Sequence, residues 1–359
     1  MLRCGTTTGA CAAAATKAAV CALFGTPAST VTLAAPPRTF SVVACTVTDG
    51  IATCAVRKDA GDDPDITDGV LVYATVRRAT SNITIDGGDG IGRVTKPGLD
   101  QPVGAAAINS TPRRMIEQAA RDAMAAHGYT GGLSITISIP NGASLAAKTF
   151  NPRLGIVGGL SILGTTGIVE PMSEAALVDT IRAELRLRAA TGATHVLLIP
   201  GNYGITFCQD TLGIDADAYV KCSNFIGDAV TMAVEAGFTS ILLVGHIGKL
   251  VKLGLGLRNT HSQHGDGRME TLIACALAAG APGALLHEIL DCVSTDAALT
   301  LLRDAGQLAP TMEELSRRID ACLTRWVPDG VTIGFVCFTH TEILAQSETA
   351  DTLLKYGRN

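Results

Sequence analysis

The 359-residue chain has few aromatic residues, few charged residues and no long apolar run. Aromatic residues make up 4% and charged residues 17%, whereas hydrophobic residues reach 47%, which is typical of a folded α/β protein. The longest apolar stretches, such as Ser240–Val244 and Ile333–Phe338, are far shorter than the roughly 20 residues of a membrane span. The net charge of −5 and the lack of a basic, aromatic-rich run argue against nucleic acid. We therefore expect neither a membrane nor a nucleic acid as a partner.

Cysteine pairs are missing as well. The eleven cysteines are an odd number and include no C-x-x-C pair, which is typical of reduced thiols. The N-terminal segment lacks the apolar core of a signal peptide, so we expect a cytoplasmic protein. Asp49-Gly50 predicts a two-residue hairpin turn that places Cys45 opposite Cys54. A disulfide there is the alternative, but we expect two thiols that face the core.

Three common ligand-binding or catalytic motifs are also missing. One is missing from the chain's most informative segment, and two are missing from the whole chain. The glycine-rich segment 151–172 lacks the G-x-G-x-x-G spacing of dinucleotide-binding loops, and no Walker A loop or G-x-S-x-G elbow occurs anywhere. The segment reads as a strand over Leu154–Val157, a loop, and a helix that begins near Ser173, a layout that exposes backbone N–H groups to a ligand. The loop residues that we expect to contact this ligand are Gly158, Gly159, Ser161, Gly164, Thr165 and Thr166.

The length favours two domains, and the pattern of predicted elements changes near residue 150. Residues 1–150 read as an α+β domain with helices over Thr7–Phe24 and Thr111–Ala126. In residues 151–359, strands alternate with helices, which predicts a Rossmann-like, doubly wound parallel sheet. Its expected strands are Leu154–Val157, His195–Ile199, Ser240–Val244 and Val331–Phe338. We expect the strand ends at Gly158-Gly159, Pro200-Gly201-Asn202 and Gly245-His246 to meet in one crevice.

Two loops of the first half carry clustered charges. Lys58–Asp65 holds four carboxylates in a loop that directly follows a strand, so it is either a metal or acid–base site or a polar turn. Gly87–Gly98 contains Arg93 and Lys96 among glycines, so it is either an anion-binding loop or a plain surface loop. Arg113 lies in the first turn of a predicted helix, where a positive charge opposes the helix dipole unless a negative ligand is near.

In the second half, Gly245–Lys249 follows a buried strand, and Asn259–Glu270 gathers histidines, acids and an arginine at a helix start. His261 and His264 have the chemistry of metal ligands, but no third and fourth ligands accompany them. We therefore expect no protein-bound metal.

These segments together resemble the CbiD family, the cobalt-precorrin-5B C-1 methyltransferases of anaerobic cobalamin synthesis. The resemblance runs over nearly the whole chain, in long segments that follow the family's order. Its carriers are GTTTGACAAAATKAA at Gly5–Ala19, KDAGDDPDITDG at Lys58–Gly69, GRVTKPGL at Gly92–Leu99, VGAAAINSTPR at Val103–Arg113, TFNPRLGIVGGLSILGTTGIVEPMSEAAL at Thr149–Leu177, GN at Gly201-Asn202, SNFIGDA at Ser223–Ala229, LLVGHIGKLVKL at Leu242–Leu253 and NTHSQHGDGRME at Asn259–Glu270. The chain departs from the family pattern at Thr6, at Ser110 and at Gln263-His264-Gly265.

The resemblance implies methyl transfer from S-adenosylmethionine to C-1 of a cobalt-containing tetrapyrrole, whose cobalt arrives within the substrate. It implies that the second domain binds S-adenosylmethionine and that loops of the first bind the tetrapyrrole. The implied cofactor-binding residues are Gly158, Gly159, Ser161, Gly164, Thr165, Thr166, Asn202, Asp266 and Glu270. Those implied for the substrate's carboxylates are Lys58, Arg93, Lys96, Arg113, Arg153, Lys249 and Arg268. The candidate bases are His246 and His261, followed by Asp59 and Asp62.

Two other functions stay open on the sequence. One is a nucleotide-dependent enzyme that uses the Gly158–Gly167 loop, and the other is a non-catalytic tetrapyrrole carrier of the same pathway. A homodimer is the default expectation for the assembly.

Overall fold

The computed structural model describes residues 2–214, 219–340 and 342–356, and the chain divides into two compact units, Met1–Glu174 and Ala175–Asn359. The division lies later than residue 150, where the sequence placed it. The reason is that segment 151–172 pairs with strands of the first unit, so the glycine-rich loop belongs to that unit.

Unit 1 is built on a six-stranded sheet. In sheet order its strands are β2 (Thr30–Ala34), β3 (Pro37–Thr48), β4 (Ile51–Arg57), β5 (Leu71–Ala79), β8 (Gly132–Ser138) and β6 (Ile83–Gly87). Neighbours are antiparallel except β6 and β8, which are parallel. Val72, Ala74 and Val76 alternate along β5 and are fully buried, so one face of the sheet forms the core.

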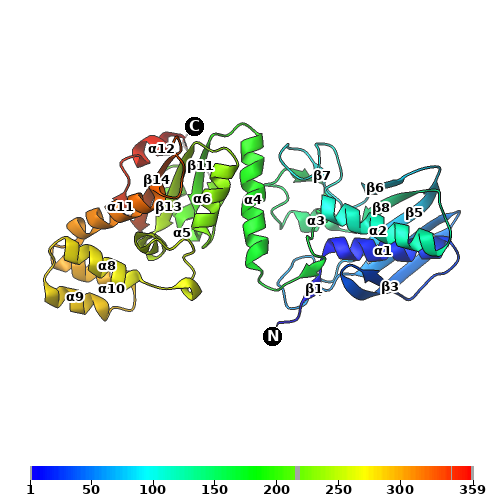
Figure 1. The fold of residues 1–359 in the computed structure, drawn as a ribbon, viewed down its shortest axis with the longest axis horizontal. Coiled ribbons are helices and arrows are strands. Elements are labelled where there is room, and N and C mark those ends of the chain that lie inside the picture. Colours follow the sequence, from blue (N-terminus) through cyan, green and yellow to red (C-terminus); the bar gives the residue numbers. More distant parts are fainter. Residues whose placement is uncertain (1, 215–218, 341, 357–359) are drawn as a thin grey trace. The chain divides into compact units, whose positions relative to one another are not determined.

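Helices α1 (Thr8–Leu23) and α2 (Ser110–Ala126) lie side by side on this sheet (Figure 1). α1 is buried nearly all round, which is typical of a helix without a polar face. Its alanines leave room for the sheet and for α2 to approach closely. Its one charged residue, Lys17, donates from Nζ to the carbonyl oxygen of Thr32 at 2.8 Å.

Short strands complete unit 1. β1 (Gly5–Thr6) pairs with β10 (Ile168–Val169), and β7 (Arg93–Val94) pairs with β9 (Ile156–Val157). Helix α3 (Gly142–Ala146) precedes the glycine-rich loop. Because β9 pairs with β7, the predicted strand Leu154–Val157 is not part of a parallel sheet, and that expectation was wrong.

Unit 2 holds a five-stranded sheet. Its order is β12 (Tyr219–Lys221), β11 (His195–Ile199), β13 (Ser240–His246), β14 (Thr332–Thr339) and β15 (Glu342–Gln346). The first four strands are parallel and β15 is antiparallel. The predicted parallel strands His195–Ile199, Ser240–Val244 and Val331–Phe338 are therefore confirmed, with small shifts of their ends.

Helices cover both faces of this sheet. Leu197, Ile199 and Leu242 pack on the side of α5 (Asn202–Asp210) and α12 (Ala350–Tyr356). The alternate residues Val196, Leu198 and Ile241 pack on the side of α4 (Glu174–Ala190), α6 (Ile226–Glu235) and α11 (Leu308–Thr324). The other helices of unit 2 are α7 (Ile247–Leu250), α8 (Arg268–Ala278), α9 (Gly283–Leu290) and α10 (Thr295–Asp304). No helix within the described ranges is long and apolar enough to cross a membrane.

The predicted hairpin puts Cys45 directly opposite Cys54, and all eleven cysteines are free thiols. Cys54 is buried in the core, but Cys45 is exposed, so only one of the two thiols fits the expectation. The difference arises because the end of β3, from Cys45 to Thr48, is exposed to solvent.

Candidate functional site

A hollow opens at the carboxyl ends of β11 and β13, the neighbouring parallel strands of unit 2. The chain leaves β11 through α5 to reach β12 on one side, and it leaves β12 through α6 to reach β13 on the other. Because α5 and α6 lie on opposite faces, the strand order reverses here, and open α/β sheets bind ligands at such a point. The hollow has a volume of about 170 Å³ and is lined by Pro200, Gly201, Tyr203, Gly204, Gly245, His246, Gly248 and Lys249. The ends of these two strands therefore meet as the sequence predicted, whereas Gly158-Gly159 lies in the other unit.

His246 is held as a neutral hydrogen-bond donor. Burial lowers the pKa of His246 below its ordinary value, although the carboxylate of Asp296 opposes this shift. Its Nδ1 accepts the N–H of Gly248 at 3.1 Å, so in the neutral ring the proton lies on Nε2. The lone pair that a general base needs is thus already engaged. This geometry fits a donor and does not fit the expected base.

Lys249 is fully engaged with the protein. Its Nζ donates to the carbonyl oxygen of Pro200 at 2.7 Å, to Asn224 Oδ1 at 2.7 Å and to the carbonyl oxygen of Ser223 at 3.4 Å. Burial lowers the pKa of the ammonium group. An ammonium group has three donors, and three acceptors are present, so Lys249 is a structural clamp rather than the expected contact for a substrate carboxylate.

The first turn of α5 contributes one predicted residue and one that sequence analysis missed. Asn202, a predicted cofactor contact, begins α5 beside the hollow, and its Oδ1 accepts Lys221 Nζ at 2.7 Å. Tyr203 lines the hollow and is 78% exposed. Its position directly after a strand end, in a chain with few aromatic residues, is the signal that could have found it.

Asp296 was also missed. It lies in the first turn of α10, and its Oδ1 accepts the hydroxyl of Thr339 at 3.4 Å, at the carboxyl end of β14. Its negative charge raises the pKa of His246, against the effect of burial. Residue 296 is about 50 positions from His246 in the chain, and nothing in the local sequence marks it.

Segment Asn259–Glu270 uses most of its polar groups within itself. His261 Nδ1 accepts the N–H of Gln263 at 3.2 Å, as His246 does with Gly248. Asp266 accepts two hydrogen bonds from Arg268, at 2.5 and 2.7 Å, and these bonds lower the pKa of Asp266. Their charges thus largely offset each other, which weakens the expected roles of Asp266 toward a cation and of Arg268 toward an anion. Glu270 is exposed in the first turn of α8.

The acidic loop of unit 1 anchors the N-terminal segment. Asp59 Oδ1 accepts the N–H of Gly61 at 2.9 Å, and its Oδ2 forms an ion pair with Arg3 at 2.5 Å. Asp62 accepts the backbone N–H of Arg3 at 2.6 Å. The hydrogen bond from Arg3 lowers the pKa of Asp59, which makes this carboxylate a weaker base.

The same loop contains a buried ion pair. Lys58 is 2% exposed, and its Nζ donates to Asp65 at 2.6 Å. Asp65 also accepts from the backbone and hydroxyl of Thr67, both at 2.7 Å. Within the described residues, no three His, Cys, Asp or Glu side chains gather so that they could hold a metal ion. Of the two readings of this loop, these contacts favour the polar turn, and Lys58 is not presented to a substrate.

Packing accounts for two glycines of the glycine-rich loop. A side-chain carbon at Gly159 would lie 2.3 Å from the carbonyl oxygen of Gly90, and one at Gly164 would lie 2.4 Å from Thr7 Oγ1. Gly158 has a φ of +86° and open space around it. Gly159 and Gly164 are therefore required by close contacts within unit 1, so they give no evidence of a ligand.

The other predicted residues of this loop differ in exposure. Ser161 is buried, and its hydroxyl donates to Asn151 Oδ1 at 3.1 Å. Thr165 is exposed, and Thr166 is an exposed residue whose hydroxyl turns back to Ile168. Only the two threonines and Gly158 are thus presented to a ligand.

The predicted cations of unit 1 are not equivalent. Arg93 is exposed and bonds Asp86 at 2.7 and 3.1 Å. Lys96 is exposed, and within the described part of the chain no residue forms an ion pair or hydrogen bond with its side chain. Arg153 is half-buried. Lys96 is therefore the cation most readily available to a ligand, whereas Asp86 largely offsets the charge of Arg93.

Arg113 stabilises the backbone instead. Its guanidinium donates to the carbonyl oxygens of Ile108 and Ile85 at 2.9 Å each and to that of Ala106 at 3.4 Å, and burial lowers its pKa. These carbonyl dipoles supply the negative partner that the helix start requires, so no ligand carboxylate is needed.

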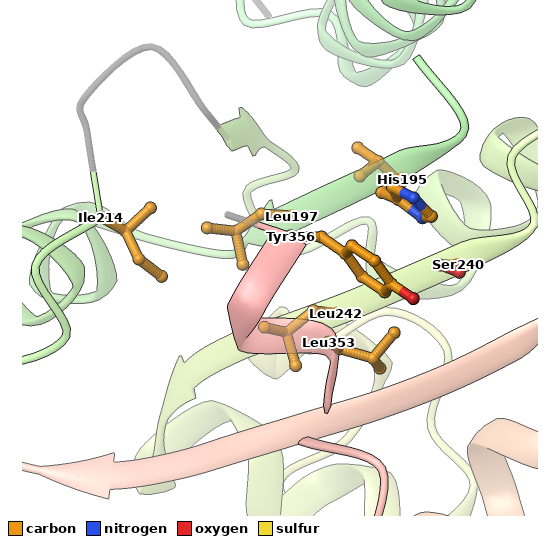
Figure 2. A pocket seen from close by; sticks show the side chains of 8 residues that line it. His195, Leu197, Ile214, Ser240, Leu242, Leu353 and Tyr356 are labelled. Carbon is orange, nitrogen blue, oxygen red and sulfur yellow. The ribbon is translucent and has the colours of Figure 1, made fainter. Parts of the chain in front are cut away.

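A second hollow, of about 180 Å³, lies at the opposite ends of the same strands of unit 2 (Figure 2). His195 and Ser240 begin β11 and β13 there, and the ring of Tyr356 stacks on His195 with centroids 3.8 Å apart. Ligands of open α/β sheets bind at the carboxyl ends of the strands, not at these amino ends. We therefore place the candidate site at the hollow beside His246, although it is slightly the smaller of the two.

Comparisons with known proteins give one consistent result. Residues 1–171 match the family model described as CbiD, and residues 259–348 match the model described as CbiD, C-terminal domain. A cobalt-precorrin-5B C(1)-methyltransferase of Ruminiclostridium cellulolyticum is 45% identical over 309 residues, which cover 85% of this chain and 80% of that protein. A protein of the same name from Edwardsiella ictaluri is 46% identical over 323 residues, 89% of this chain and 84% of that one.

The comparison with solved structures gives a weaker match. A crystal structure of a cobalamin biosynthesis protein (cbiD) from Archaeoglobus fulgidus is 23% identical over 85% of each chain, with a TM-score of 0.39, which is too low to support a structural argument. The two family models, together with relatives that each cover more than four fifths of this sequence, show that the chain belongs to the CbiD family.

Proposed function

We propose that this protein transfers a methyl group from S-adenosylmethionine to C-1 of cobalt-precorrin-5B in cobalamin biosynthesis. Membership of the CbiD family and the name that the relatives share support the reaction. The structural observation that carries the proposal is the hollow at the carboxyl ends of β11 and β13, where the strand order of a parallel sheet reverses.

Unit 2, as a Rossmann-like domain, is proposed to hold the methyl donor. Tyr203 at the start of α5 and His246 at the end of β13 line the hollow where the donor would bind, and Asn202 lies next to Tyr203 in the chain. The sulfonium of the donor is a cation, which a nearby carboxylate stabilises. The charge of Asp296 acts on His246, whereas the charge of Asp266 is offset by Arg268. We therefore assign that role to Asp296, with Glu270 as the remaining predicted acid.

Unit 1 is proposed to bind the tetrapyrrole, an apolar macrocycle with several carboxylate arms. Arg93 on β7 lies directly opposite Val157 on β9, and directly opposed residues of an antiparallel pair share one face. Val157 is 59% exposed, so an apolar side chain lies on the same face as the guanidinium of Arg93, which also bonds Asp86. Lys96, two residues beyond β7, adds a second exposed cation. Thr165 and Thr166, whose side chains are also exposed, remain proposed ligand contacts.

The contribution of this protein to methyl transfer is proposed to be mainly positional. Holding a donor methyl in line with the acceptor carbon is worth on the order of 7–11 kcal/mol without any covalent step by the protein. This fits a protein in which His246 of unit 2 is locked as a donor and the acidic loop of unit 1 has a structural role. No residue is therefore assigned as a base, and the cobalt belongs to the substrate.

The test is an anaerobic incubation of the protein with S-adenosylmethionine and cobalt-precorrin-5B, followed by mass spectrometry of the tetrapyrrole. We expect a gain of one methyl group that requires both the donor and the protein. Tight tetrapyrrole binding without a methyl gain would instead support a carrier. A nucleotide-induced rise in melting temperature that S-adenosylmethionine does not produce would support a nucleotide-dependent enzyme.

A further inference from the structure

The hollow of unit 2 has an exposed aromatic ring at its rim. Tyr203 lies in the first turn of α5 and is 78% exposed, although this chain has only five tyrosines. Its ring centroid is 5.9 Å from that of His246, with the two planes tilted by 42°. An exposed ring next to a hollow is not needed for packing of the core, and aromatic faces are the common platform for flat heterocycles.

Two glycines keep the hollow open without being required by the backbone. Gly201 has a φ of −173°, which any residue adopts, and the nearest atom to an added side-chain carbon would be Lys249 Cε at 3.9 Å. At Gly248 the nearest atom would be His246 Nδ1 at 3.4 Å, an ordinary contact. Both glycines line the hollow, and at both an added side-chain carbon would meet only ordinary contacts. This contrasts with Gly159, which close packing explains.

The charges around the hollow indicate what it binds. The ammonium of Lys249 is taken up by three acceptors of the protein, so the hollow offers a phosphate or a carboxylate no available cation among its lining residues. His246 offers Nε2–H, for which no acceptor exists within the described residues. At about 170 Å³ the hollow is smaller than the 300–1,000 Å³ of pockets for whole ligands, so it fits one ring system of a larger molecule.

We propose that Tyr203 is the stacking platform for the adenine ring of S-adenosylmethionine and that Nε2–H of His246 donates to an adenine nitrogen. This inference rests on the proposed methyl donor and names the part of the donor that the hollow recognises. Adenine is neutral, flat and rich in acceptor nitrogens, and these are the properties that the hollow matches. Tyr203 is then a specificity-determining residue of the reaction.

The experiment is calorimetric titration of the full-length protein with S-adenosylhomocysteine and, separately, with methylthioadenosine, which keeps the adenosine but lacks the amino acid. We expect Tyr203→Ala to weaken both ligands by roughly tenfold or more, and Tyr203→Phe to stay within about twofold of the wild type. Tyr356→Ala removes a tyrosine from the other hollow and is the matched control. Because Tyr203 is exposed, its variants should keep the melting temperature of the wild type.

The outcomes separate this inference from the proposed function. If Tyr203→Ala binds both ligands as tightly as the wild type does, the role of Tyr203 is overturned. The proposed methyl donor is not contradicted by that result. If Tyr203→Ala weakens the binding of S-adenosylhomocysteine only, the adenine binds elsewhere and the amino acid lies at Tyr203. That result also overturns the role of Tyr203. If the wild type binds neither ligand, with or without tetrapyrrole, the proposed donor itself is contradicted.

Discussion

The Nζ atom of Lys249 lies 2.7 Å from the carbonyl oxygen of Pro200. The same atom lies 2.7 Å from Asn224 Oδ1, so one side chain joins the end of β11 to the turn before α6. These two segments flank the point where the strand order reverses. The candidate site of unit 2 is therefore held open by an internal clamp and not by the ligand.

Replacing Lys249 should loosen this clamp. Lys249→Met keeps the stem but removes the ammonium, so the Pro200 carbonyl loses this donor and Asn224 Oδ1 keeps only the Thr260 hydroxyl, at 3.3 Å. We expect the free energy of unfolding to fall by about 1–3 kcal/mol. Urea denaturation measures this loss, with Lys355→Met, at an exposed position of α12, as the control. Equal stability of Lys249→Met and the wild type would show that the clamp is not structural.

Stability should depend on pH through His246. Burial lowers the pKa of His246 in the folded state, so below its ordinary value of about 6.5 the unfolded chain binds a proton more readily than the folded protein. The contribution of the neutral ring is complete above this pH and is lost as the pH falls through the folded-state pKa. His246→Gln should therefore lose less stability than the wild type between about pH 8 and about pH 5. Identical slopes for the two proteins would contradict this.

The Lys58–Asp65 pair should behave as a buried ion pair. Burial alone raises the pKa of Asp65, but the hydrogen bonds from Lys58 and Thr67 outweigh it, and the pKa lies below its usual range. The contribution to stability is thus present above about pH 4 and is lost as the pH falls further.

Removing one partner of this pair tests the assignment. We expect Lys58→Met to cost about 2 kcal/mol, less than the roughly 3–5 kcal/mol of a fully buried pair, because the Asp65 side chain is 25% exposed. The double variant Lys58→Met/Asp65→Leu should recover part of this loss in urea denaturation. A methyltransferase assay in which Lys58→Met folds stably but loses substrate binding would instead restore Lys58 as a substrate contact.

Gly159→Ala should destabilise unit 1, because the new methyl would lie 2.3 Å from the carbonyl oxygen of Gly90. Overpacking of this kind typically costs about 1–3 kcal/mol. Gly283→Ala, where nothing lies within 4 Å, is the control and should leave the melting temperature unchanged. A stable Gly159→Ala that has lost only its affinity for S-adenosylmethionine would return the loop to the role of a cofactor cradle.

The sequence predicted those elements whose signal is local. β11 and β13 each contain a run of four apolar residues, and their ends met in one hollow as expected. The glycine-rich segment was assigned to the wrong sheet because its partners are distant in the chain: Leu160 bridges to Ile91 and Ile162 to Ile108. Bridges between single residues that are distant in the chain produce no periodic pattern in the sequence.

The roles of charged residues were harder to predict than their positions. Lys249 and Arg113 stood out because they accompany strand and helix ends, but both donate to backbone carbonyl oxygens, which any sequence provides. Asp296 could not be found because only the fold brings α10 to the end of β14. Tyr203 could have been found, since a rare aromatic residue follows a predicted strand end directly.

The most direct test of the account uses S-adenosylmethionine whose methyl carbon carries a heavy isotope. The protein is incubated with this donor and cobalt-precorrin-5B without oxygen, and the product is examined by carbon NMR. We predict one new labelled methyl signal, attached at C-1 of the macrocycle and absent when the protein is omitted. A labelled methyl at another ring position, or no label in a tetrapyrrole that the protein demonstrably binds, would contradict it.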